Sequence, residues 1–230
     1  MKRILVGVCS TRNHKKFWDS FFNLMNELKE SYDVSAQIIK DINLPDAQNQ
    51  LAENFIMARY DYLLLLDDDH WGHTKEMVDT LVNANTYMAT IKSYSRHYPY
   101  SCALMKKFNK GYAGIENGEG YQECDLTGFP MTLMKKDLFD KLDKPYFRPT
   151  KGDTRSWATD KNFCEKIIEK GIKPMGCFQH CLPHDDITEE NVYERRYDER
   201  SQHNNVALYT LFNHNQRSLK CTDLQPVQRQ

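Results

Sequence analysis

The chain has no apolar run near the roughly 20 residues that a helix needs to cross a bilayer. It also carries almost no net charge, because 31 basic residues nearly balance 32 acidic ones and leave a formal charge of −1. This balance excludes an overall attraction to nucleic acid or anionic lipid, although a local patch can still bind either. The apolar part of residues 1–9 is too short for a secretion signal. We therefore interpret it as the first strand of a cytoplasmic protein, located in the host cytoplasm if the protein is viral.

A disulfide framework is missing too, because the seven cysteines are odd in number and scattered along the chain. This usage favours free thiols in a reducing compartment. One cluster, Cys177, His180, Cys181 and His184, has the residue types of a zinc site. Its apolar surroundings indicate a strand, however, and four ligands so close together on a strand do not converge easily. We therefore disfavour a structural zinc site.

Strand and helix patterns alternate through the first half of the chain. The apolar runs that predict strands lie at residues 4–8, 34–39, 63–66 and 87–91. Helical spacing of apolar residues fills the intervals, and Asp46 and Thr74 are candidate N-caps for two of these helices. A βαβ series of this kind forms a parallel sheet, and its ligands bind at the carboxyl ends of the strands.

The second half is less regular. Residues 94–107 are aromatic and basic and predict irregular strands or a hairpin. Residues 110–121 hold four glycines and predict a mobile loop. A helix is predicted over 159–170, with Thr159 as its cap. The polar segment from residue 187 onward predicts one or two surface helices and a loose end.

Three aspartates, Asp67, Asp68 and Asp69, directly follow a buried strand pattern and have no cation among them. Burying such carboxylates unpaired is costly. Oxygen ligands suit hard divalent cations such as Mg²⁺ and Mn²⁺, which commonly carry a diphosphate. Strand alternation directs Asp67 and Asp69 to one side and Asp68 to the other. The triplet therefore predicts a metal-diphosphate site rather than a solvated acidic turn.

Two histidines follow the triplet in the pattern H-x-x-H. His70 and His73 enter the predicted helix, where solvent exposure or capping is a better interpretation than metal binding. Trp71, between them, is equally compatible with stacking on a sugar or base and with burial in the core.

Several segments, in order along the chain, resemble motifs of the GT-A glycosyltransferases, especially the inverting type of family 2. The aspartate triplet resembles their D-x-D motif, and Asn49–Ala52 resembles R-N-x-(A/V), with Gln48 in the place of the arginine. Residues 159–164 resemble E-D-x-D-F-C, with Thr159 and Asn162 in the places of two acids. The other matching segments are 89–96, 128–139 and the His-containing strand 178–184.

This resemblance implies a GT-A nucleotide-diphospho-sugar transferase fold, which is an α/β fold with a Rossmann-like mixed sheet flanked by helices. It implies a catalytic domain over residues 1–186 and a C-terminal helical extension over residues 187–230. Within the catalytic domain, residues 1–92 would form the nucleotide-sugar half and residues 93–186 the acceptor half.

The resemblance also implies roles for individual residues. Asp69 and Asp67 hold Mn²⁺ or Mg²⁺, with His184, slightly preferred over His180, as a third ligand; Asp67 alternatively binds the ribose. Asp160 is the general base that deprotonates the acceptor hydroxyl. The residues expected to bind the nucleotide-sugar are Thr11, Arg12, Asn13, Asp41, Gln48, Asn49, Asp67, Asp68, Lys92 and Arg96. The residues expected on the acceptor side are Gly128, Phe129 and Trp157.

The function expected from this pattern is metal-dependent transfer of a sugar from a nucleotide-sugar, a UDP-sugar above all, to an acceptor hydroxyl with inversion. The acceptor is a sugar, a protein or a modified DNA base. Two alternatives remain. A sugar-nucleotidyltransferase usually has a glycine-rich basic loop after its first strand, whereas residues 9–16 contain no glycine. A non-catalytic nucleotide-sugar-binding module is suggested by Gln48, Thr159 and Asn162 in place of motif residues.

Overall fold

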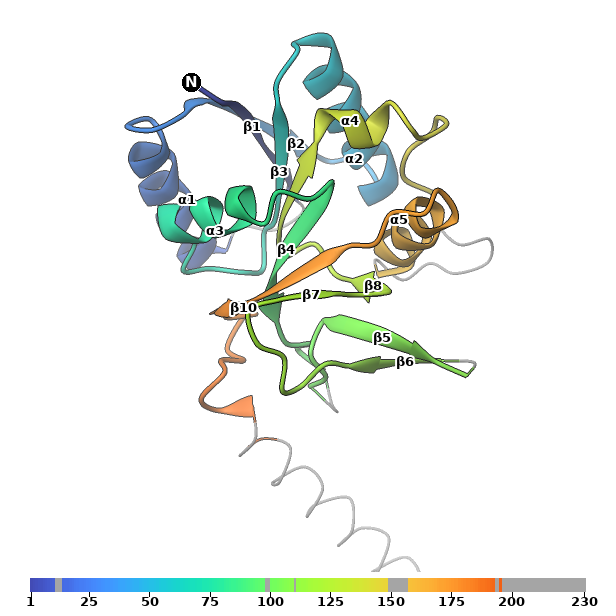
Figure 1. Cartoon of the computed structure of the whole chain (residues 1–230). Helices are drawn as coiled ribbons and strands as arrows, with labels where there is room; N and C mark the ends of the chain where they lie inside the picture. The colour runs from blue at the N-terminus through green and yellow to red at the C-terminus, as the bar shows by residue number, and fades with distance from the viewer. Residues whose placement is uncertain (11–13, 98–99, 110, 149–156, 193–194, 196–230) are drawn as a thin grey trace, which may run out of the picture. The chain divides into compact units, whose positions relative to one another are not determined.

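The computed structural model describes residues 1–10, 14–97, 100–109, 111–148, 157–192 and 195 (Figure 1). The chain divides into two compact units, residues 1–189 and residues 190–230. All the named helices and strands belong to the first unit. In the second unit, the backbone N–H of Arg195 donates to the carbonyl of Asn191 at 3.1 Å, as in a helical turn.

A seven-stranded mixed sheet forms the centre of the first unit, with strand order β2-β1-β3-β9-β4-β10-β7. Strand β9 runs antiparallel to β3 and β4, and β7 runs antiparallel to β10, while β2, β1, β3, β4 and β10 are parallel to their other neighbours. The strands are β1 (Arg3–Ser10), β2 (Asp33–Lys40), β3 (Tyr62–Asp67), β4 (Met88–Ser93), β7 (Tyr121–Glu123), β9 (Met131–Lys135) and β10 (Met175–Leu182).

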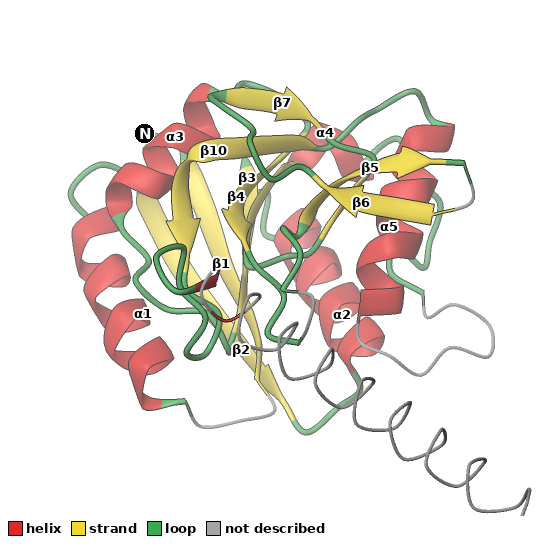
Figure 2. Cartoon of the chain, turned by 90° about the horizontal axis from the view of Figure 1, so that it is seen from below, coloured by secondary structure: helices red, strands yellow, loops and turns green. Residues whose placement is uncertain are grey.

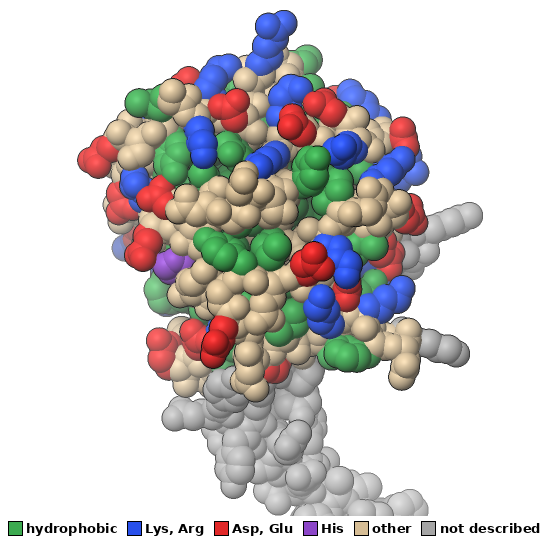
Figure 3. Space-filling model, in the orientation of Figure 1, with side chains coloured by type: hydrophobic (Ala, Val, Ile, Leu, Met, Phe, Trp, Pro, Cys, Tyr) green, Lys and Arg blue, Asp and Glu red, His purple; other side chains and the backbone are tan. Residues whose placement is uncertain are grey.

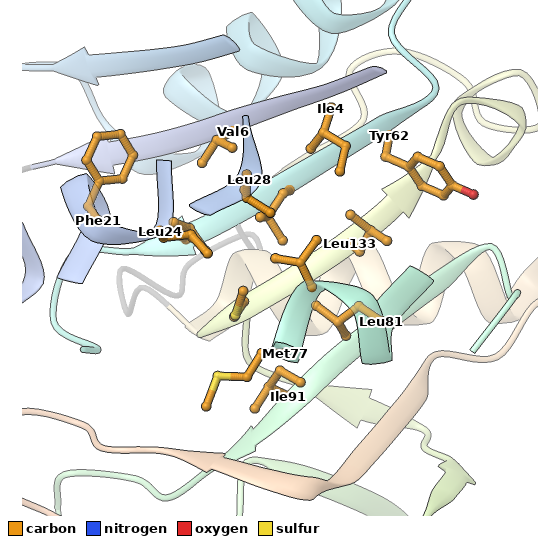
Figure 4. Close-up of a cluster of buried hydrophobic side chains, with 14 of the residues drawn as sticks. Ile4, Val6, Phe21, Leu24, Leu28, Tyr62, Met77, Leu81, Ile91 and Leu133 are labelled. Carbon is orange, nitrogen blue, oxygen red and sulfur yellow. The ribbon is translucent and has the colours of Figure 1, made fainter. Parts of the chain in front are cut away.

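Helices cover both faces of this sheet (Figure 2). They are α1 (Lys15–Leu28), α2 (Leu44–Met57), α3 (Lys75–Asn83), α4 (Lys136–Phe139) and α5 (Trp157–Glu169). Strand β3 contributes to the cores on both faces, because successive side chains alternate across a sheet. Leu64 and Leu66 pack in the cluster with α1 and α3, and Leu63 and Leu65 pack in the cluster with α2 and α5. Figure 4 shows the first cluster, with Leu24 and Leu28 from α1 and Met77 and Leu81 from α3.

A second, smaller sheet has the order β6-β5-β8, with strands β5 (Leu104–Phe108), β6 (Gly111–Gly114) and β8 (Leu126–Thr127). The predicted loop over 110–121 is therefore wrong in part, because it contains β6 and the start of β7. Gly114 illustrates the reason: a Cβ atom there would lie 2.9 Å from the backbone of Cys102. Here glycine permits close approach of two segments rather than mobility.

Two of the three predicted N-cap residues do not cap their helices in the structure. Thr74 caps α3 as predicted, because its side chain accepts from the N–H of Met77. Helix α2 is capped by Asn43 and not by Asp46, whose own N–H donates to the Asn43 side chain. Helix α5 begins at Trp157, so Thr159 lies inside it and cannot be its cap. Asp160 nonetheless lies in the first turn, as predicted.

The outer surface agrees with the composition. On the face seen in Figure 3, basic and acidic side chains are interspersed, without a large patch of one sign. No helix among the described residues is long and apolar enough to span a membrane. The six cysteines in the described part of the chain are all free thiols.

Candidate functional site

The turn after β3 is joined to the segment after β10 at the carboxyl edge of the sheet. The N–H of Asp185 donates to the carbonyl of Asp69 at 2.8 Å, and the N–H of Trp71 donates to the carbonyl of Pro183 at 3.3 Å. The indole Nε1 of Trp71 also donates to the carbonyl of Asp185 at 2.7 Å. These backbone contacts bring His184 beside the aspartate triplet.

Asp69, His70 and His184 form one group, called here the Asp-His-His group, whose candidate ligand atoms all lie within 4.8 Å of one another. Nδ1 of His70 lies 3.0 Å from Oδ1 of Asp69, and Nε2 of His184 lies 3.1 Å from Oδ2. The two imidazole rings stack with their centroids 4.2 Å apart. It is the only group of this kind among the described residues.

The hydrogen bonding of His184 leaves one ring nitrogen facing the carboxylate. Nδ1 lies 2.9 Å from the carbonyl oxygen of Tyr94, which only accepts, so Nδ1 carries the proton in the neutral ring. Nε2 then presents a lone pair to Asp69, and two acceptors face each other at 3.1 Å. Nε2 of His184 and Nε2 of His70 have no hydrogen-bond partner within the described part of the chain. A cation, either a proton or a metal ion, resolves this arrangement.

The protonation states suit a metal ligand set. Burial raises the pKa of Asp69, but hydrogen bonds with His184 and His70 outweigh it and hold that pKa well below its usual range; the bond with His184 needs the proton on Nε2 that resolves the facing acceptors. Burial lowers the pKa of His70 and outweighs the opposing attraction of Asp69. At neutral pH, Asp69 is therefore ionised and His70 is neutral, as metal coordination requires.

Two further charged residues border this group. Nη1 of Arg96 lies 3.3 Å from Oδ2 of Asp69 and 3.4 Å from Oδ2 of Asp185. Asp185 has a left-handed backbone, with φ of 53°. Non-glycine residues held in that region often mark functional sites.

Asp67, Asp160 and Gln48 form a second group on the α2 and α5 side of the same strand end, made of two carboxylates and an amide. Burial raises the pKa of Asp67, and the negative charges of Asp160, Asp69 and Asp68 raise it further. Burial and the charge of Asp69 likewise raise the pKa of Asp160, although a hydrogen bond with Gln48 opposes the shift. A Cβ atom on Gly128 would lie 3.9 Å from the Asp160 carboxylate, so that side of Asp160 is bordered by glycine.

A hollow of about 290 Å³ adjoins the Asp-His-His group on the α1 side. Trp71 forms part of its wall, and the ammonium of Lys16 lies 4.6 Å from the centre of the indole ring. The residues that line the hollow are His14, Lys15, Lys16, Phe17, Asp69, His70, Trp71, Asp185 and Asp186.

Several residues that are expected to bind ligands have structural partners within the fold. The Asn49 side chain donates to the carbonyl of Phe147 at 2.8 Å and accepts from its N–H at 3.0 Å. Lys92 is buried and paired with Glu189. Phe129 is fully buried in the core with α5. These side chains hold the fold together, because each is bonded to or packed against a distant part of the chain.

The remaining expected residues are placed as follows. Asp68 is buried, and Asp41 is exposed with a left-handed backbone at φ 63°. Nε2 of His180 lies 3.0 Å from the Thr80 hydroxyl, outside the Asp-His-His group. The predicted nucleotide contacts Thr11, Arg12 and Asn13 and the side chain of Trp157 lie outside the described residues.

The sequence interpretation missed two residues of the site, His70 and Asp185. His70 and His73 are both buried, so the expected exposure is wrong. His73 is a packing residue, with Nδ1 3.0 Å from the Ser20 hydroxyl, whereas His70 joins Asp69. Asp185 was not among the expected site residues. The sequence signals that could have indicated His70 and Asp185 were the H-x-x-H pattern beside the triplet and the two acids that follow His184.

The comparisons with known proteins bear on the fold. No protein-family model and no curated protein matches the chain. Among solved structures, A197 from STIV matches with a TM-score of 0.55 and 17% identity, over 78% of this chain and 83% of that chain. S. aureus TarS 1-349 matches with a TM-score of 0.46 and 13% identity, over 79% and 60% of the two chains. 4-Diphosphocytidyl-2C-methyl-D-erythritol synthase from Anaerococcus prevotii gives 0.40 and 10%, over 86% and 96%.

At these identities the likeness to A197 shows a shared fold and nothing about activity, and the two lower TM-scores add no argument. The fold class predicted from the sequence is confirmed. The chain has a mixed α/β nucleotide-diphospho-sugar transferase fold, with a mostly parallel seven-stranded sheet flanked by helices.

Proposed function

We propose that this chain is a metal-dependent glycosyltransferase that moves a sugar from a UDP-sugar to an acceptor hydroxyl with inversion. The observation that carries the proposal is the Asp-His-His group at the carboxyl edge of the sheet, with Asp67 and Asp160 on the other side of the same strand end. In open α/β sheets this edge is where ligands bind.

The metal ion is assigned to Asp69, His70 and His184. This assignment replaces Asp67 by His70 in the ligand set expected from the sequence, because His70 lies 3.0 Å from Asp69 and belongs to the Asp-His-His group, whereas Asp67 does not. Two imidazoles and one carboxylate favour Mn²⁺ over Mg²⁺, which prefers an all-oxygen shell. A divalent ion here supplies charge neutralisation for the diphosphate that leaves with the nucleotide.

Asp160 is assigned as the general base. Its place in the first turn of α5 favours the ionised carboxylate, and the Gln48 side chain bonds to it. Gln48 thus orients the base instead of binding a phosphate as an arginine would. Positive charge at Asp69 would also replace a repulsion on Asp160 by an attraction and lower its pKa toward the value that a base needs at neutral pH.

The test is UDP binding and UDP release. UDP is titrated calorimetrically into the protein with Mn²⁺ and again with EDTA, and UDP release from UDP-sugars is measured with sugar, protein and hydroxymethylated DNA acceptors. Metal-dependent UDP binding and acceptor-stimulated UDP release support the proposal. Equal UDP affinity in Mn²⁺ and EDTA would overturn the metal assignment.

The two alternatives give different products in the same assays. A sugar-nucleotidyltransferase releases pyrophosphate from a nucleoside triphosphate and a sugar phosphate. A non-catalytic binding module binds the UDP-sugar and releases no UDP with any acceptor.

A further inference from the structure

Arg96 contacts the carboxylate of Asp69, a residue that is assigned to the metal. Its Nη1 lies 3.3 Å from Oδ2 of Asp69, and the same oxygen lies 3.1 Å from Nε2 of His184. The second contact of Nη1, at 3.4 Å, is with Oδ2 of Asp185. A guanidinium therefore supplies the positive charge beside Asp69 in this structure.

Asp185 is held in place independently of Arg96. Its N–H donates to the carbonyl of Asp69 and its own carbonyl accepts from Nε1 of Trp71. Its left-handed backbone fixes the direction in which the side chain leaves the chain. Arg96 is thus paired with two carboxylates whose positions the backbone determines, rather than with a mobile surface acid.

The net charge at Asp69, Asp185 and Arg96 changes sign when a divalent cation binds there. Two carboxylates against one guanidinium leave one excess negative charge, which repels a diphosphate. A bound divalent cation converts it into one excess positive charge, which attracts a diphosphate. Like charges repel, so a metal ion on Asp69 also weakens the attraction that keeps Arg96 there.

We propose that Arg96 couples metal binding to nucleotide binding. The guanidinium neutralises Asp69 until Mn²⁺ binds, then leaves Asp69 and binds the donor diphosphate, whose oxygens match its planar fork of N–H donors. Arg96 therefore competes with the metal and cooperates with the nucleotide. This inference rests on the proposed function, because it requires the metal and the UDP-sugar to share the site.

The competition predicts opposite effects of one substitution. Arg96→Met should bind Mn²⁺ more tightly than the wild type, by about twofold to fivefold, since a partly exposed ion pair no longer has to be broken. With Mn²⁺ bound, the same variant should bind UDP more weakly, by about tenfold or more, because one charge-assisted contact is lost.

The experiment measures Mn²⁺ affinity without nucleotide, and UDP affinity in saturating Mn²⁺, for wild type, Arg96→Met and Arg96→Lys. Arg96→Lys keeps the charge and should recover part of both effects. Arg59→Met is the matched control, because Arg59 is exposed just after α2, away from the carboxyl edge. Arg96→Gln replaces Arg96→Met if the latter does not show a cooperative melting transition.

The outcomes separate this inference from the proposed function. Tighter Mn²⁺ and weaker UDP binding in Arg96→Met support the coupling. Weaker Mn²⁺ binding would overturn it and make Arg96 a structural counter-ion of the ligand set, and unchanged UDP affinity would also overturn it. A wild-type protein that binds UDP equally in Mn²⁺ and EDTA contradicts the proposed function itself, whatever the variants do.

Discussion

Asp67 and Asp69 stand two residues apart at the end of one strand, yet their surroundings shift their pKa values in opposite directions. Asp69 has two imidazoles beside it, and its hydrogen bonds with them lower its pKa. Asp67 has burial and three other carboxylates around it, and its pKa is raised. Carboxylates of such different character can do different chemistry at one site. The comparison suggests that the Asp69 side holds cations and the Asp67–Asp160 side handles a proton.

The largest effect is expected from Asp69→Asn. Removing the only carboxylate of the Asp-His-His group should abolish transfer and remove metal-dependent UDP binding. Asp68→Asn is the matched control, because Asp68 is adjacent in sequence but outside that group. UDP titrations in Mn²⁺ and transfer rates measure both. Equal loss of activity in Asp69→Asn and Asp68→Asn would show that the effect is not specific to the Asp-His-His group.

A loss confined to turnover is expected from Asp160→Asn. Removing a general base typically costs on the order of 10²–10⁴ in rate. UDP affinity should change by less than about threefold, since the base contacts the acceptor proton and not the nucleotide. Single-turnover rates and UDP titrations measure the two quantities.

Glu165→Gln is the control for this variant, because Glu165 lies on the same helix and binds the Tyr112 hydroxyl. A retained rate in Asp160→Asn would return Asp160 to a structural role at the start of α5. Lost UDP binding would instead indicate that Asp160 takes part in binding the metal or the nucleotide.

A smaller effect is expected from His70→Ala. Loss of one imidazole should weaken Mn²⁺ binding by about tenfold or more, since the loss of an outer-shell residue alone typically costs about that much. The preference for Mn²⁺ over Mg²⁺ should also narrow, because imidazole is the ligand that disfavours Mg²⁺. His180→Ala is the control, since His180 contacts Thr80 instead. Unchanged Mn²⁺ affinity would remove His70 from the ligand set.

The smallest effect is expected in the pH dependence of stability without metal. The raised pKa values of Asp67 and Asp160 mean that the folded state binds more protons than the unfolded state above the ordinary aspartate pKa of 3.8. Their contribution to stability therefore falls as pH rises through that window. In EDTA, acidification from pH 7 to pH 5 should stabilise the wild type relative to Asp160→Asn. Melting curves of both proteins test this, and parallel pH profiles would contradict the raised pKa of Asp160.

Local patterns predicted most of the sheet and its helices. The strand indicated by the apolar surroundings of Cys177, His180 and Cys181 is β10, Met175–Leu182. Helix α3 and its Thr74 cap were likewise readable, because capping depends on residues three apart. The strand-alternation argument for the triplet applies only to Asp67, since β3 ends there and the chain then turns.

What the sequence pattern could not give was the partner of each polar side chain. Asn49 bonds to Phe147 and Lys92 pairs with Glu189, and these partners lie 98 and 97 residues away. The burial of His70 depends in the same way on the segment around His184, which packs against its ring. No local periodicity reports a contact of that separation.

The join between Trp71 and Asp185, which are 114 residues apart, has a consequence for the order of assembly. During synthesis, the aspartate triplet leaves the ribosome long before His184, so Asp69 and His70 exist for a time without their third partner. Contacts between such distant segments form late in folding, because the intervening loop must close first. Metal affinity should therefore appear only when β10 has docked beside β4, and bound Mn²⁺ would report that the sheet is complete.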